Sequence, residues 1–156
     1  MNKIILIIGL LIIGLSSCSD TADSNNLDSD NYDKKDERVE VLKKEIKTFR
    51  EIENAEFELF NVNGFSNSRT TVPGASSWDY KFVIKVNPSD IDKWTTGLIK
   101  IELDGSDKAW MDKIIEKRKN NWKTKTEPEF YTRKGDNVTL AVYRTEGIIF
   151  KRVINN

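Results

Sequence analysis

The sequence predicts an α+β fold, a single domain in which an antiparallel sheet carries helices packed on one face. Residues 78–86 alternate apolar and polar side chains, as a half-buried antiparallel strand does. Residues 36–52 instead place apolar side chains at three- and four-residue spacing, which is typical of an amphipathic helix. The predicted elements follow in the order helix, strand, strand, helix, strands. This order favours an antiparallel sheet with helices on one side.

The first half of the domain begins with that helix, whose apolar positions are Val39, Leu42, Ile46, Phe49 and Ile52. A short strand is expected at residues 56–62, before the clearest strand of the chain at 78–86. The polar segment between them, residues 63–77, is a loop of about 15 residues, a length typical of functional or disordered loops. Asn87-Pro88 then ends the strand, and Ser89 or Asp90 can cap a single helical turn through Trp94.

The second half alternates strands with one more helix. We expect strands at residues 98–103, 130–131, 138–144 and 148–154, the last two closed around a turn at 145–147. A helix is expected at 109–119, with Ser106 or Asp107 as its N-cap. Residues 37–156 include 44 apolar or aromatic residues out of 120, which is enough for one hydrophobic core.

The first 18 residues have a different character. Lys3 precedes twelve apolar or glycine residues at 4–15, too few for the about 20 that span a bilayer, and Ser16-Ser17-Cys18 follows. This pattern resembles the leader and lipobox of a bacterial lipoprotein, Leu15-Ser16-Ser17-Cys18. The resemblance implies that residues 1–17 are a signal peptide that is removed. It also implies that Cys18 becomes the acylated N-terminus and holds the protein to a membrane of the cell envelope.

The lipoprotein resemblance covers the leader alone. By it, Ser19 implies the outer rather than the inner membrane in a bacterium that has two. The alternatives are an ordinary cleaved secretory peptide or a buried helix. Because Cys18 is the only cysteine, a disulfide within the chain is excluded.

Charge divides the rest of the chain into two parts. Residues 18–36 hold six Asp against two Lys and few apolar side chains, so we expect a flexible acidic tether. Residues 37–156, the expected globular domain, hold 22 basic and 19 acidic residues, a net charge of +3. So small an excess argues against a nucleic-acid partner. The basic stretch at 113–125 is expected to be a solvated helix face, or else to contact an anionic polymer, lipid headgroups or an acidic partner.

The search for catalytic motifs predicts no enzyme, no cofactor and no metal site. The chain has no histidine, and its single cysteine is assigned to lipid. No Gly-rich phosphate loop, Gly-x-Ser-x-Gly or Ser-x-x-Lys motif is present. Residues 104–107, Asp-Gly-Ser-Asp, resemble a fragment of a calcium loop but lack its remaining ligands, so a turn and helix cap are expected. A carboxylate-based hydrolase remains a third alternative, should Asp79, Asp90, Asp92 and Glu102 approach one another.

Four tryptophans lie within 45 residues, at positions 78, 94, 110 and 122. Core packing is the simplest interpretation, but Trp94 and Trp122 fit the apolar patterns less well, and tryptophan is enriched in interface hot spots. We therefore predict a partner-contact surface drawn from Arg69, Trp78, Trp94 and Trp122. The predicted function is a non-enzymatic, lipid-anchored envelope protein that binds another macromolecule, as an assembly or structural factor or as an immunity or inhibitor protein. The alternative is a domain that binds a small ligand or glycan in a cavity between sheet and helix.

Overall fold

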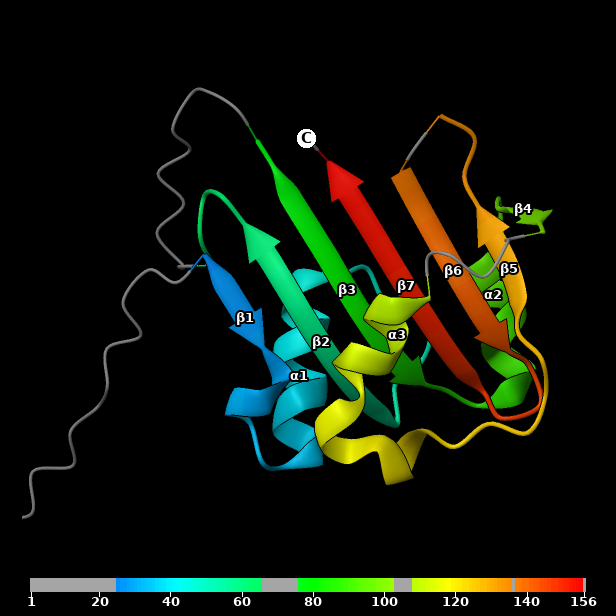
Figure 1. The fold of residues 1–156 in the computed structure, drawn as a ribbon, viewed down its shortest axis with the longest axis horizontal. Helices are drawn as coiled ribbons and strands as arrows, with labels where there is room; N and C mark the ends of the chain where they lie inside the picture. The colour runs from blue at the N-terminus through cyan, green and yellow to red at the C-terminus, as the bar shows by residue number, and fades with distance from the viewer. Residues whose placement is uncertain (1–24, 66–75, 103–107, 136, 156) are drawn as a thin grey trace, which may run out of the picture.

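The computed structural model describes residues 25–65, 76–102, 108–135 and 137–155. They form one seven-stranded sheet with helices packed against it (Figure 1), in the strand order β1-β2-β3-β7-β6-β5-β4. Every neighbouring pair is antiparallel. The strands are β1 Asn26–Asp28, β2 Asn54–Asn61, β3 Trp78–Lys85, β4 Ile99–Ile101, β5 Glu129–Thr132, β6 Asn137–Tyr143 and β7 Ile148–Asn155. The helices are η1 Ser29–Asn31, α1 Lys35–Glu45, η2 Pro88–Asp90, α2 Ile91–Thr95, α3 Ala109–Ile114 and η4 Glu116–Trp122. The predicted α+β class with one antiparallel sheet is confirmed.

The centre of the sheet is the pairing of β3 with β7. These strands are paired over eight positions, from Trp78 opposite Asn155 to Lys85 opposite Ile148. β1 and β2 extend the sheet from β3, and β6, β5 and β4 extend it from β7. The sheet therefore joins an N-terminal part to a C-terminal part along a single pair of strands.

Helices cover both faces of the sheet, whereas the sequence led us to expect them on one. Along β3, Phe82 and Ile84 pack into the core under α1 and α2, while Val83 between them packs into a second core under α3 and η4. β7 divides in the same way, with Ile149 on one side and Phe150 on the other. Because alternate residues of a strand point to opposite faces, strands that are apolar at consecutive positions need cover on both sides.

Several element boundaries differ from those expected. The predicted tether, residues 18–36, is too long at its C-terminal end, because Asn26 pairs with Phe60 and Asp28 with Glu58 at the sheet edge. α1 ends at Glu45 rather than near residue 52. The chain must turn back after the helix because Glu53 N–H donates to the carbonyl of Lys85, the last residue of β3. The helix expected at 109–119 ends at Ile114 and continues as η4.

The predicted turn between β6 and β7 depends on Gly147. Its φ of +68° lies in the left-handed region, and its carbonyl accepts a hydrogen bond from Val86 N–H at 2.9 Å. A Cβ at this position would lie 2.1 Å from the Val86 carbonyl oxygen. Only glycine therefore fits both the backbone conformation and the close approach. Among the described helices, none has the length and apolar character needed to cross a membrane.

Candidate interaction surface

The face of the sheet that carries α3 and η4 is covered along only part of its length (Figure 1). The helices lie over the apolar positions around Val83 and Phe150. Toward the end where β1 begins, no helix in the described ranges lies over the strands. Two rows of side chains there are at least partly exposed, and we call them the open face. One row is Glu58, Lys81, Arg152, Thr139, Thr132 and Ile99, and the other is Phe60, Asp79, Ile154 and Asn137.

Large apolar side chains mark the two sides of the open face. Phe60 on β2 is 37% exposed, and Ile99 on β4, at the opposite sheet edge, is 51% exposed. Ile154 of β7 lies between them and is partly exposed. Since the face runs from β2 to β4 across strands spaced about 4.8 Å apart, it is roughly 24 Å wide. That width accommodates a helix or a strand pair of another protein.

The charges at the centre of the open face are paired with one another. Arg152 makes a two-pronged contact with Asp79, with Nε to Oδ1 and Nη2 to Oδ2 both at 3.0 Å. Lys81 Nζ lies 3.4 Å from Asp79 Oδ2 and 3.6 Å from Glu58 Oε2. Burial alone would raise the pKa of Asp79, but the Arg152 hydrogen bonds and the Lys81 charge outweigh it and hold this pKa below its ordinary value. The open face thus presents fixed, ionised groups.

A groove borders the open face beside β1. It has a volume of about 270 Å³ and lies between the edge strand β1, the next two strands β2 and β3, and α3. Lys113 of α3 reaches over it to Glu58, with Nζ 3.4 Å from Oε1. The groove is lined by Asn26, Leu27, Asp28, Glu58, Leu59, Phe60, Asp79, Lys81 and Lys113.

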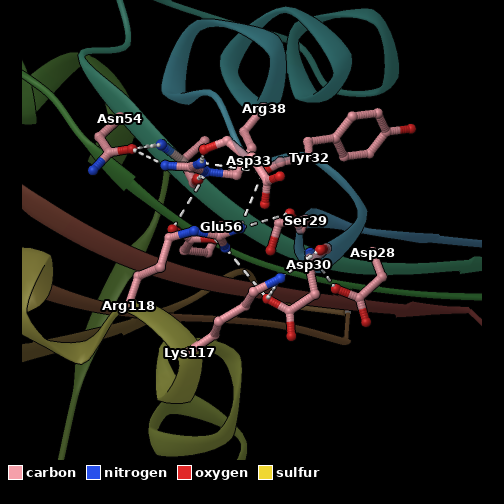
Figure 2. A network of polar contacts seen from close by, with 11 residues as sticks. Asp28, Ser29, Asp30, Tyr32, Asp33, Arg38, Asn54, Glu56, Lys117 and Arg118 are labelled. Atoms are coloured by element: carbon pink, nitrogen blue, oxygen red, sulfur yellow. Dashed lines mark hydrogen bonds and ion pairs between the residues drawn. The ribbon is translucent and has the colours of Figure 1, made fainter.

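Next to this groove lies a buried group of charges that fixes the sheet edge (Figure 2). Glu56 on β2 is 1% exposed and lies between Arg38 of α1 and Arg118 of η4. Arg118 Nη1 donates to Glu56 Oε2 at 2.7 Å and to Asp30 Oδ1 at 3.3 Å. We call Arg38, Glu56, Arg118 and Asp30 the Glu56 cluster. It joins elements that are far apart in the sequence.

The two arginines also bind the backbone of the N-terminal segment. Arg118 Nη2 donates to the Tyr32 carbonyl at 3.0 Å, and Arg38 Nη1 donates to the Asp33 carbonyl at 2.9 Å. Backbone carbonyls of a segment without regular pairing need such donors when they are shielded from water. The segment around η1 is therefore held by side chains of α1 and η4, in addition to the packing of its own Leu27 and Tyr32 against the core.

Glu56 is incompletely satisfied. Arg38 Nε lies 3.4 Å from Glu56 Oε1, but its hydrogen bond goes to the Ala55 carbonyl at 3.0 Å. Oε1 thus has an ion-pair neighbour but no hydrogen-bond donor within the described chain. Burial lowers the pKa of Arg38, and the nearby Glu56 carboxylate offsets part of this shift. The cluster is a buried charge group whose balance depends on Glu56 and both arginines.

The backbone of η4 explains how Arg118 reaches Glu56. Arg118 has φ −129° and ψ 34°, which is not helical and breaks η4 into two parts. The break lies within residues 109–119, where the sequence predicted one regular helix. The chain is therefore kinked at a position where a regular helical turn was expected. The kink turns the guanidinium toward the sheet edge, where Glu56 and Asp30 lie.

The predicted contact residues do not form one surface. Trp94 of α2 is buried against one face of the sheet, where its ring packs edge-on with the ring of Phe49, with 5.2 Å between the centroids. Trp122 of η4 is buried against the other face. Core packing, the simpler interpretation, describes both. Trp78 begins β3 and is partly exposed. Arg69 and Cys18 lie outside the described residues, so contact with a partner and lipidation stay predictions.

The carboxylates that might have formed a catalytic pair are dispersed. Asp79 binds Arg152, Asp90 lies 3.2 Å from Arg50 Nε, and Asp92 lies 2.7 Å from an Arg144 nitrogen. Within the described ranges, no group of three or more acidic, Cys or His side chains is placed to hold a metal ion. The segment 104–107 lies outside the described residues.

Sequence reasoning missed the Glu56 cluster. A signal for Arg38 exists, because it lies four residues before Leu42 and therefore on the buried face of α1. Glu56 gave none, since strand alternation places it with Glu58 on the side opposite Phe57 and Leu59, a pattern typical of a row of side chains that faces water.

The fold and the open face define a single-domain α+β protein whose described helices cover one face of its antiparallel sheet only in part. No protein-family model, no curated protein and no solved structure matches the chain.

Proposed function

We propose that this protein is a lipid-anchored protein of the cell envelope that binds another macromolecule through the open face, without catalysing a reaction. The observation that carries the proposal is the part of the sheet that no described helix covers, with paired charges at its centre and exposed apolar side chains at both sides. The partner is a protein, either a component that this chain helps to assemble or an enzyme or toxin that it inhibits.

The composition of the open face supports macromolecular binding. Exposed apolar side chains at Phe60 and Ile99 offer area that a partner can bury. Arginine is enriched among interface hot spots, and Arg152 is fixed in place by Asp79. Side chains already held on rigid strands lose little conformational entropy on binding. The open face is thus preorganised for a complementary surface.

The same ion pairs argue against a catalytic role. A general acid near neutral pH needs a raised carboxyl pKa, whereas Arg152 and Lys81 hold the pKa of Asp79 below its ordinary value. Glu58 lies between Lys81 and Lys113. These carboxylates serve to fix cations on the surface.

The position of β1 supports an anchored orientation. Asn61 N–H donates to the Asn25 carbonyl, so backbone pairing at this sheet edge extends to residue 25. Seven residue steps separate this point from Cys18, a reach of about 25 Å at full extension. Because Asn26 pairs with Phe60, β1 begins beside the open face, which is the end of the strand that the predicted anchor precedes. A partner bound there would lie close to the membrane.

The test is affinity capture with the full chain as bait from membrane and envelope fractions, analysed by mass spectrometry. We expect one stoichiometric protein partner for the wild type. The double variant Phe60→Glu/Ile99→Glu should lose it, because two carboxylates would replace apolar contact area. Phe49→Glu is the matched control, since Phe49 is also 37% exposed but contacts Trp94 of α2 under the opposite face.

Thermal melting of each variant separates lost binding from lost folding. Retention of the partner by the folded double variant would rule out the open face as its site. Anchoring is tested separately by Cys18→Ser, which should abolish incorporation of labelled fatty acid and release the chain from membranes. Membrane association that persists in this variant would contradict the lipid anchor. The open face would then be tested by the affinity capture alone.

A further inference from the structure

A second groove lies between the α3–η4 segment and strands β6 and β7, and it shares no lining residue with the open face. Its volume is about 200 Å³, below the roughly 300–1,000 Å³ of sites for drug-sized ligands. Its apolar lining is supplied by Met111, Ile115, Trp122, Tyr143 and Phe150. The groove therefore has the size and lining for a small apolar group.

Two of the side chains that line the groove carry shielded polar groups. Burial raises the pKa of the Tyr143 phenol above its ordinary value, and the nearby carboxylates of Glu127, Asp112 and Glu146 raise it further. Trp122 is buried, and its indole N–H has no acceptor within the described chain. Most buried polar groups in proteins do have a partner. The Trp122 indole N–H, buried and without an acceptor in the described chain, is therefore an exception among buried polar groups.

Two exposed lysines lie at the rim of the groove. Lys119 and Lys123 line the groove, both are exposed, and no carboxylate in the described ranges forms an ion pair with either. Lys113 and Lys117, from the same segment, are instead paired with Glu58 and Asp30. Asp112 is the one acidic side chain among the described residues that line the groove, so these lining residues carry a net charge of +1.

We propose that this groove binds a small amphiphilic anion, with an aromatic or short aliphatic group against the apolar lining and a carboxylate, sulfonate or phosphate between Lys119 and Lys123. The lysines select the charge, because no carboxylate of the described ranges forms an ion pair with their ammonium groups, and the volume limits the apolar part to about one ring with a short chain. Binding here is independent of the partner proposed for the open face.

The test is isothermal titration calorimetry of the full chain with 4-phenylbutyrate, with 4-phenylbutylamine as a ligand of the same shape and opposite charge. We expect saturable one-to-one binding of the carboxylate and at least about tenfold weaker binding of the amine. The variant Lys119→Gln/Lys123→Gln should weaken carboxylate binding by about tenfold.

The control variant Lys44→Gln/Lys93→Gln removes the same charge from exposed positions on α1 and α2, away from the groove, and should bind as the wild type does. Equal affinity for the amine and the carboxylate would overturn the proposal. Unchanged binding in Lys119→Gln/Lys123→Gln would overturn it as well, as would the absence of saturable heat at millimolar ligand.

Discussion

Two clusters at opposite edges of the sheet are each built on one glutamate, and they differ in burial and in hydrogen bonding. Glu56, beside β1, is almost wholly buried between two arginines, and one of its oxygens accepts no hydrogen bond within the described chain. Glu129, on β5 beside β4, is partly exposed and has both oxygens engaged. Lys100 donates to Oε1 at 2.8 Å, while Arg144 and Tyr131 donate to Oε2 at 2.8 and 2.7 Å.

Hydrogen bonding and burial have different consequences in these two clusters. Hydrogen bonds from Lys100, Arg144 and Tyr131 lower the pKa of Glu129 to about 2, although this side chain is 30% exposed. Burial instead determines what it costs to remove one partner, because an uncompensated charge away from water is expensive while an exposed one is solvated. The Glu56 cluster should therefore dominate stability, and the Glu129 cluster should dominate the acid response.

The largest effect is expected for Glu56→Gln. This change leaves Arg38 and Arg118 without their shared carboxylate and should lower the free energy of unfolding by about 3–5 kcal/mol. Urea unfolding followed by circular dichroism measures it. Glu58→Gln is the matched control, because Glu58 is the next residue on the same side of β2 but is partly exposed, and it should cost less than about 1 kcal/mol.

Equal losses in the two glutamine variants would contradict the role given to burial. If Glu56→Gln does not fold, the triple variant Arg38→Met/Glu56→Leu/Arg118→Met distinguishes lost charge balance from lost hydrogen bonds to the backbone. Well-packed apolar side chains can replace a buried charge cluster with little loss, so this variant should fold. Its failure to fold would mean that the hydrogen bonds to the backbone around η1, not the charge balance, hold the edge.

An intermediate effect is expected for Glu129→Gln, a loss of roughly 1–2 kcal/mol at pH 7. The folded-state pKa of Glu129 is depressed to about 2 from an ordinary value of 4.5. Its contribution is therefore present above pH 4.5 and is lost as the pH falls toward 2. Urea unfolding at about pH 7 and about pH 3 should show a smaller difference between wild type and variant at the lower pH. A difference that stays constant would contradict this assignment.

The smallest effect is expected for Asp92→Asn. Asp92 pairs with Arg144 at 2.7 Å, but its side chain is 82% exposed. Removing this charge should change the free energy of unfolding by less than about 0.5 kcal/mol, and added salt should reduce the change further. A loss comparable to that of Glu129→Gln would show that the Glu129 cluster acts as a unit extending into α2.

The strands were predictable where side-chain alternation is local. The pattern at residues 78–86 predicted β3 almost to the residue, and the turn at Gly147 followed from its sequence. β1 was not predictable, because Leu27 is the one apolar residue among Asn26–Asp28 and its pairing depends on β2, some 30 positions later. The composition of this segment indicated a flexible tether, but its backbone pairs with the distant strand β2 instead.

The helix ends and the surfaces were harder to predict for the same reason. Apolar spacing extended α1 to residue 52, but the pairing of β2 with β3 ends it at Glu45. The tryptophan pattern suggested contacts at Trp94 and Trp122, and both complete cores that form only when helices cover both faces. The open face arises from register across the strands from β2 to β4, which no local pattern contains.

The pairing of β3 with β7 has a consequence for how the chain folds. It joins residues 78–85 to 148–155, and no other strand pairing in the described ranges connects the N-terminal and C-terminal parts of the sheet. Contacts so far apart in the sequence require closure of a long loop, which slows folding more than it reduces stability. Until this pairing forms, β3 and β7 both present unpaired apolar edges, so the interval before closure is when the chain is most prone to aggregate.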